Sequence, residues 1–185
     1  MSEQAVDPTI TGTRRGADVS RDEVTDKQLA NDPMHKRMVG VALHGNTPFD
    51  VPFISHIEGN LYVGGCETGL VLPSMFKHVV SLYPWERYRV KHDLSSFLEV
   101  RLFDSSELPH SAILSIAEWA SQCLETGPTL IHCQAGLNRS PLITAVVMSI
   151  YDGFTPEAAI ALLREKRSPA VLCNPYFEEW LKELE

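Results

Sequence analysis

The chain is built around a loop of nine residues, His132-Cys133-Gln134-Ala135-Gly136-Leu137-Asn138-Arg139-Ser140. An apolar run, 129–131, precedes this loop, and a long apolar stretch, 142–151, follows it. The order predicts a buried strand, a tight loop and a helix. A loop in that place directs backbone N–H groups and a helix N-terminus at one point, which suits a tetrahedral oxyanion. Cys133 can supply a thiolate there, and the planar guanidinium of Arg139 can bind two phosphate oxygens.

This loop resembles the His-Cys-x-x-Gly-x-x-Arg-Ser loop of the cysteine-dependent protein tyrosine phosphatases, and most closely that of the dual-specificity phosphatases. Five residue types match within nine positions. A match in the right strand–helix context is far more specific than a bare pattern. The resemblance covers roughly residues 52–185 and includes an opening segment that ends in Leu-Tyr-x-Gly and an Asn-Pro pair, Asn174-Pro175, before the last helix. It implies a protein tyrosine phosphatase-like α/β domain.

The remainder of the chain alternates between strand and helix patterns, as in an α/β domain with a central, mainly parallel sheet flanked by helices. A hairpin is predicted around Glu58-Gly59. Capping residues followed by proline, Thr155-Pro156 and Asn174-Pro175, predict the starts of two helices. The other elements predicted from apolar patterns are a short helical piece over 67–76, strands over 78–82 and 97–103, and a helix over 109–125.

The length of 185 residues indicates one domain, and we expect a flexible N-terminal tail over 1–48 followed by a catalytic domain over 49–185. A net charge of −8 argues against a general nucleic-acid or membrane-surface binder. No apolar run is long enough to cross a membrane. The four cysteines form no CxxC pair and no zinc spacing. We therefore expect a cytoplasmic, reducing setting and no metal ion or cofactor; the oligomeric state is left open.

Cys133 is the candidate nucleophile, because the following helix and Arg139 both favour its thiolate form. The alternative is a buried, inert cysteine at a strand end, which the motif argues against. Ser140 can hydrogen-bond the sulfur and help it leave, or it can act as a plain helix N-cap, and both roles can coexist. The resemblance implies that His132 supports the loop from behind.

Phosphate binding is expected from the loop interior, residues Gln134, Ala135, Gly136, Leu137 and Asn138, together with Arg139. In this loop Gly136 most simply provides a backbone conformation closed to other residues. The alternative for Arg139 is a surface ion pair, which the loop context argues against.

The leaving alcohol or phenol needs a proton, and the same acid can then activate the water that cleaves the phosphocysteine. The resemblance implies an aspartate on a loop upstream of the cysteine. Asp104, at the end of a predicted strand, occupies that place in this chain, and Glu107 is the second candidate. The other interpretation is that Asp104 caps the helix that begins near Pro109.

Three weaker features have plainer interpretations. Alternating cations at Arg87, Arg89 and Lys91 are more simply a solvated surface than a rim for an acidic substrate. The cations that end a helix, Arg164, Lys166 and Arg167, are explained by its dipole. Cys66 and Cys173 are better explained as buried structural cysteines than as disulfide partners for an oxidised Cys133.

The function that these residues imply, through the resemblance, is hydrolysis of phosphomonoesters through a phosphocysteine intermediate. The expected substrates are phosphorylated proteins that carry phosphotyrosine and phosphoserine or phosphothreonine. A phosphoinositide phosphatase and an RNA 5′-triphosphatase are alternatives on the same loop chemistry. A phosphate-binding pseudophosphatase and a sulfur-transfer protein of the rhodanese type are alternatives from other classes.

Overall fold

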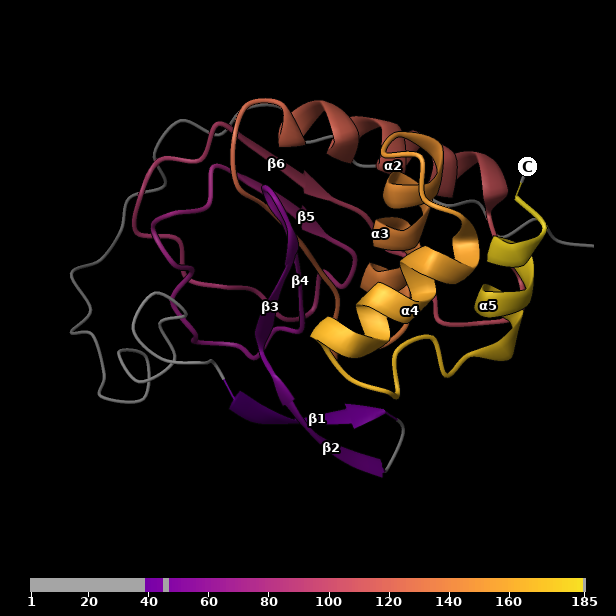
Figure 1. Ribbon diagram of the computed structural model, residues 1–185. Helices are drawn as coiled ribbons and strands as arrows, with labels where there is room; N and C mark the ends of the chain where they lie inside the picture. Colours follow the sequence, from indigo (N-terminus) through magenta and orange to yellow (C-terminus); the bar gives the residue numbers. More distant parts are fainter. Residues whose placement is uncertain (1–38, 45–46, 185) are drawn as a thin grey trace, which may run out of the picture.

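A five-stranded sheet forms the centre of the protein, whose computed structural model describes residues 39–44 and 47–184 (Figure 1). The strands lie in the order β3–β4–β7–β5–β6, with β3 antiparallel to β4 and all other neighbours parallel. Their bounds are β3 Ile54–Glu58, β4 Leu61–Gly64, β5 His78–Ser81, β6 Ser96–Glu99 and β7 Thr129–His132. The predicted α/β fold with a mainly parallel sheet and the hairpin of β3 and β4 are thus confirmed.

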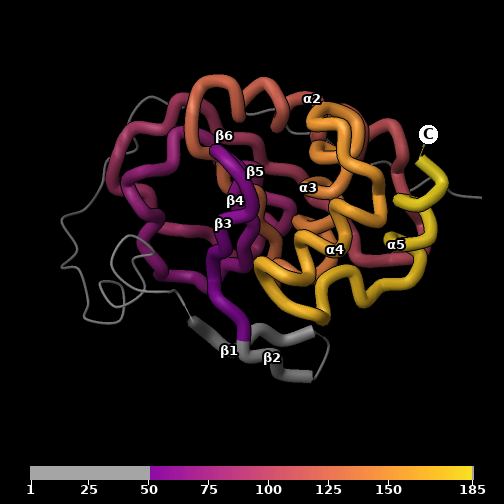
Figure 2. The backbone as a smooth tube through the Cα atoms, viewed as in Figure 1, coloured from indigo at the N-terminus to yellow at the C-terminus, as the bar shows by residue number. Residues whose placement is uncertain are grey.

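Helices cover one face of the sheet, and α3 lies at their centre (Figures 1 and 2). The helices are α2 His110–Leu124, α3 Arg139–Ile150, α4 Pro156–Lys166 and α5 Pro175–Lys182. Every residue of α3 from Arg139 to Met148 is buried, since α2, α4, α5, β4 and β7 all pack around it. No described helix has the length and apolar character needed to cross a membrane. The central helix therefore holds the loop that precedes it against a rigid core.

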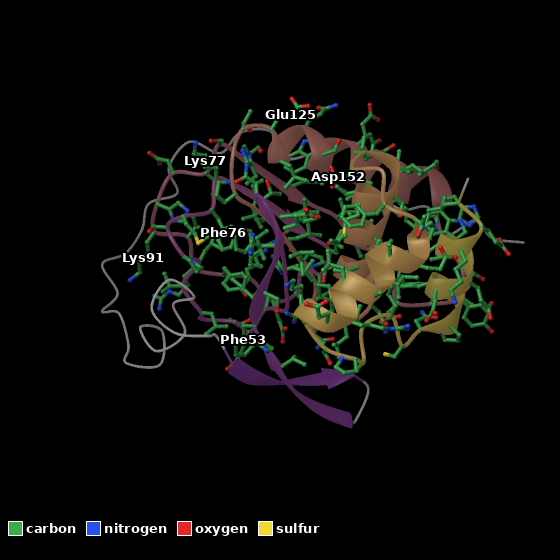
Figure 3. The ribbon with its side chains drawn as sticks, viewed as in Figure 1. Phe53, Phe76, Lys77, Lys91, Glu125 and Asp152 are labelled. Carbon is green, nitrogen blue, oxygen red and sulfur yellow. The ribbon has the colours of Figure 1, made fainter. Side chains whose placement is uncertain are left out.

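The two faces of the sheet have different covers because successive side chains of a strand point to opposite sides. Ile131 of β7 faces the helices, whereas Leu130 packs with Phe76 in a second apolar cluster on the other face. Irregular connections cover that face, and Phe76 lies in one of them (Figure 3). The helical piece predicted over 67–76 is wrong: the backbones of Leu70 and Leu72 bond to Arg89 instead.

An antiparallel ribbon of β1, Val39–His44, and β2, Thr47–Pro52, precedes the sheet (Figure 1). Its first strand lies within the segment 1–48 for which the sequence predicts a tail, and its second strand crosses the predicted boundary. The two strands pair with each other along their whole lengths, from Val39 opposite Pro52 to His44 opposite Thr47. Residues 1–38 and 45–46 of that predicted tail lie outside the described residues.

The predicted helix starts agree with the observed capping contacts. The Thr155 hydroxyl accepts a hydrogen bond from the backbone N–H of Ala158 at 3.2 Å, and the Asn174 side-chain oxygen accepts one from Tyr176 N–H at 3.2 Å. Each cap satisfies one of the free N–H groups that begin a helix, and a proline follows each cap. These two caps fix where α4 and α5 begin, and the second also borders the pocket described below.

Candidate active site

The nine-residue loop follows β7, whose neighbours on both sides are the parallel strands β4 and β5. Ligands of such sheets bind at the carboxyl ends of the strands. A cavity of about 470 Å³ opens there. The residues that line it are Asp104, Cys133, Gln134, Ala135, Leu137, Asn138, Arg139, Cys173, Asn174 and Pro175. The structure thus brings most of the predicted site residues into one pocket.

The sulfur of Cys133 accepts two hydrogen bonds. The donors are the backbone N–H of Gly136, at 3.2 Å, and the hydroxyl of Ser140, at 3.3 Å. The residue is 1% exposed and borders the cavity. Donors aimed at a sulfur favour its negatively charged form. The sulfur that both donors reach thus belongs to a residue that lines the cavity.

Ser140 lies inside α3 and does not cap it. The capping position belongs to Asn138, whose side chain makes no capping bond, so the N-cap interpretation of Ser140 is wrong. The Ser140 hydroxyl lies 3.1 Å from the Gly64 carbonyl oxygen and 3.3 Å from the Cys133 sulfur. A hydroxyl carries one proton, so it can donate to only one of these acceptors at a time.

Arg167 supports the loop from below, a role that the sequence did not reveal. Its guanidinium donates hydrogen bonds to the carbonyl oxygens of Gly136 and Ala135. It also contacts the Val63 carbonyl oxygen and the Ser55 hydroxyl. Burial lowers the pKa of Arg167 to about 10, and the nearby Cys133 counteracts this effect, so the group stays charged at neutral pH. A buried cation needs such partners to offset its desolvation. Its charge lies directly behind the loop that surrounds the sulfur.

Gly136 has a φ of +70° and lies against the Arg167 guanidinium and the backbone of Gly64. A Cβ at this position would lie 2.5 Å from the Gly64 carbonyl carbon, and it would also overlap the guanidinium. Both the backbone angle and the close contacts therefore require glycine here.

Gly136→Ala is expected to lower the free energy of unfolding by about 1–2 kcal/mol for the backbone angle and by a further ~1–3 kcal/mol for the overlap. Gly153→Ala is the matched control, since Gly153 has a similar φ of +75° but open space around it. Urea unfolding of the two variants separates the free-energy cost of the backbone angle from that of the steric overlap. Equal losses in both would show that the contact with Arg167 and Gly64 does not matter.

Arg139 reaches the pocket with part of its guanidinium unpaired. Its Nη1 donates to the Leu102 carbonyl oxygen at 3.5 Å, and the group lies 4.9 Å from the centre of the Tyr83 ring. Its Nε is buried and has no hydrogen-bond partner among the described residues. A buried N–H without a partner costs free energy unless a ligand supplies an acceptor. The Nε–H donor of Arg139 suits an oxygen atom of a bound oxyanion.

Asp104 lies across the pocket, and two asparagines hold its carboxylate. Asn138 Nδ2 donates to one carboxylate oxygen at 2.9 Å, and Asn174 Nδ2 donates to the other at 2.8 Å. Asn138, predicted to bind phosphate, thus directs its side chain at Asp104. The other candidate, Glu107, does not line the cavity. The helix-cap interpretation of Asp104 is wrong, since Pro109 occupies the capping position of α2 and no side chain bonds there.

His132 ends β7 behind the loop. Burial lowers its pKa to about 4, so the ring is neutral at working pH, and its Nδ1–H lies 3.4 Å from the Cys133 carbonyl oxygen. The Tyr88 ring packs edge-on against it with centroids 5.3 Å apart, and the Tyr88 hydroxyl donates to the Gly65 carbonyl oxygen. His132 is thus buried next to Cys133 and does not itself line the cavity.

The two remaining cysteines of the sequence analysis and the cations near Arg87 differ in where they lie relative to the cavity. Cys66 is buried, but Cys173 is exposed and lines the cavity, so the expectation of two buried cysteines is wrong for Cys173. Burial raises the pKa of the Cys66 thiol, and the negative charge of the nearby Glu86 raises it further. Arg87 pairs with Glu99. Lys91 lies on the opposite side of the molecule from α5, the helix whose first residue borders the pocket (Figure 3).

The family model for the dual specificity phosphatase catalytic domain matches residues 70–185. The chain is similar to a protein tyrosine phosphatase PRL-1 of Leishmania major, with 44% identity over 45 residues. That match spans 24% of this chain and 26% of the relative, so the shared segment is about a quarter of the relative's length.

Solved structures share the fold at low identity. A human tyrosine phosphatase-like serine/threonine/tyrosine-interacting protein has a TM-score of 0.61 and 18% identity, over 70% of this chain and 93% of its own. Human DUSP28 has a TM-score of 0.60 and 14% identity, over 70% and 95%. The PTP-2 phosphatase of Cydia pomonella has a TM-score of 0.52 and 23% identity, over 70% and 88%.

Proposed function

Because the chain belongs to the dual specificity phosphatase family, we propose that it hydrolyses phosphomonoesters through a phosphocysteine intermediate on Cys133. One observation carries the proposal: the hydrogen-bonded sulfur of Cys133, the unpaired Nε of Arg139 and the carboxylate of Asp104 all belong to one pocket. The three groups correspond to a nucleophile, an oxyanion donor and a general acid.

In the first step the Cys133 thiolate attacks phosphorus, and the bond from phosphorus to the ester oxygen breaks. The leaving oxygen takes a proton from the protonated carboxyl of Asp104. Arg139 and the loop N–H groups stabilise the charge on the phosphoryl oxygens, which is the main contribution a protein makes to phosphoryl transfer. The products of this step are a free alcohol or phenol and a phosphocysteine.

In the second step a water molecule attacks the phosphocysteine, and the Asp104 carboxylate takes the proton that the water loses. The sulfur–phosphorus bond breaks, which releases inorganic phosphate and restores the thiolate. The Ser140 hydroxyl, 3.3 Å from the sulfur, can donate to the leaving sulfur. Asp104 thus serves as acid in one step and as base in the other.

Asp104→Asn is expected to reduce kcat/KM for a phosphotyrosine peptide by about 10²–10⁴-fold, the usual contribution of general acid–base catalysis. Activated aryl phosphates, whose leaving groups need less protonation, should lose less in the first step. Glu107→Gln is the matched control, because this carboxylate comes from the same loop and does not line the pocket. A loss of that size in Glu107→Gln, with Asp104→Asn active, would assign the acid to Glu107.

The proposed substrates are phosphorylated proteins that carry phosphotyrosine and phosphoserine or phosphothreonine, in a reducing, cytoplasmic setting and without a metal ion or cofactor. The loop interior contains no lysine, which favours proteins over phosphoinositides. Phosphopeptides, phosphoinositides and RNA with a 5′-triphosphate, assayed side by side with a chelator present, rank these substrates. A cyanide-dependent thiosulfate assay tests the sulfur-transfer alternative.

A further inference from the structure

Three aromatic rings and one arginine form a row of contacts that begins at Arg139 and ends with two exposed rings. The Tyr83 ring lies against the guanidinium of Arg139 and 4.8 Å from the ring of Trp85. The Arg101 guanidinium lies 4.7 Å from the centre of the Trp85 ring and 4.7 Å from that of Phe103. Trp85 is 52% exposed and Phe103 49% exposed. We call these four residues, Tyr83, Trp85, Arg101 and Phe103, the aromatic–arginine ladder.

None of these four residues lines the cavity, but two of them adjoin residues that do. Tyr83 contacts Arg139, and Phe103 directly precedes Asp104 in the chain. The residue between Arg101 and Phe103, Leu102, accepts a hydrogen bond from Arg139. The ladder therefore begins at the arginine that is proposed to bind the phosphate.

The two rings hold the Arg101 guanidinium and leave its N–H donors available. Each ring contacts the guanidinium carbon at the distance of a cation–π interaction, which the negative face of an aromatic ring favours. The N–H donors of a guanidinium form a planar fork that fits a carboxylate or a phosphoryl group through two parallel hydrogen bonds. Because the side chain is already held, less conformational entropy is lost when such a group binds.

The charge of Arg101 is also uncompensated. No carboxylate among the described residues forms an ion pair with it, although the protein as a whole is acidic. Arg87, on a neighbouring segment, gives the contrast: its guanidinium makes two hydrogen bonds to the carboxylate of Glu99. Within the part of the chain that the structure describes, Arg101 thus has no ion-pair partner, whereas the charge of Arg87 is neutralised by Glu99.

We propose that the aromatic–arginine ladder is a substrate subsite, in which Arg101 binds an anionic side chain close in sequence to the phosphorylated residue of a protein substrate. The inference rests on the proposed phosphatase function and adds a specificity to it. The anionic side chain is a carboxylate of aspartate or glutamate, or the phosphoryl group of a second phosphorylated residue. Both present the paired oxygens that the guanidinium fork accepts.

The test compares phosphotyrosine peptides that carry glutamate, glutamine or phosphothreonine at one flanking position. That position is varied from three residues before the phosphotyrosine to three residues after it. At one position or more, kcat/KM with glutamate or phosphothreonine should exceed that with glutamine by about five- to tenfold, as for one charge-assisted contact at a partly exposed site. The glutamate and phosphothreonine series distinguish the two sources of charge.

Arg101→Ala should bring that ratio close to one, and Arg101→Lys should restore only part of it, since a point charge replaces the fork. Trp85→Leu should also lower the ratio, because Arg101 loses one of its two rings. Arg87→Ala is the matched control and should keep the wild-type ratio. A preference that survives in Arg101→Ala, or no preference at any position in the wild type, overturns the subsite.

Hydrolysis of p-nitrophenyl phosphate by the wild type separates this failure from failure of the proposed function. This substrate has no flanking residue to reach the ladder. Turnover of p-nitrophenyl phosphate without a preference among peptides rejects the subsite alone. Absence of any cysteine-dependent turnover rejects the phosphatase function, and the subsite with it.

Discussion

Cys133→Ser is expected to abolish the hydrolysis of p-nitrophenyl phosphate near pH 6, with a loss on the order of 10⁵–10⁶-fold, as for removal of a catalytic nucleophile. The serine hydroxyl is a far weaker nucleophile than a thiolate. The two donors that hold the sulfur, Gly136 N–H and the Ser140 hydroxyl, remain in place. The variant should therefore fold and keep its affinity for a phosphopeptide while it loses turnover.

Cys123→Ser is the control for this substitution. Cys123 is also buried, but it lies in α2, where its sulfur is 3.5 Å from the Ser96 hydroxyl, and it does not line the cavity. This variant should retain activity. Normal turnover in Cys133→Ser would exclude Cys133 as the nucleophile, whatever the outcome for Cys123→Ser.

Arg139→Lys is expected to reduce kcat by about 10³–10⁵-fold, the range for an arginine that neutralises a transferring phosphoryl group. Lysine keeps the charge but cannot present two parallel N–H donors to two phosphoryl oxygens. It also loses the planar contact of the guanidinium with the Tyr83 ring. Inhibition by orthovanadate, an oxyanion that resembles phosphate, should weaken in the same variant.

Arg87→Lys is the control, because Arg87 also makes two parallel hydrogen bonds to one carboxylate, but on the exposed surface. A substitution there should change activity by no more than about twofold. If Arg139→Lys turned over substrate at the wild-type rate, the phosphate-binding role of this arginine would be wrong.

The central strand, loop and helix could be predicted from the sequence because three local signals coincide there. An apolar run predicts β7, a mostly apolar stretch predicts the buried helix α3, and the loop residues between them have distinctive chemistry. The same holds for α4 and α5, whose starts follow from side-chain caps and prolines. Such signals involve residues close in sequence, which a pattern can detect.

The features that the sequence did not reveal depend on contacts between distant residues. Arg167 resembles any cation at a helix end until the fold buries it beneath Gly136. Asn138 resembles a phosphate-binding loop residue until Asp104, from the segment after β6, comes within 2.9 Å of it. The segment 67–76, for which the sequence predicts a helical piece, instead packs Leu70, Leu72 and Phe76 against the strands β5 and β7. Pairings of this kind are determined by topology rather than by local pattern.

The most direct test of the account is to detect phosphate bound to Cys133. Asp104→Asn is mixed with p-nitrophenyl phosphate, quenched in acid and analysed by mass spectrometry of its peptides. The activated leaving group allows the first step to proceed, and loss of the base slows the second. We predict a mass increase of one phosphoryl group on the peptide that contains Cys133. The double variant that carries both Asp104→Asn and Cys133→Ser should show no such increase. Turnover without such an adduct, or an adduct on another residue, would contradict the phosphocysteine mechanism.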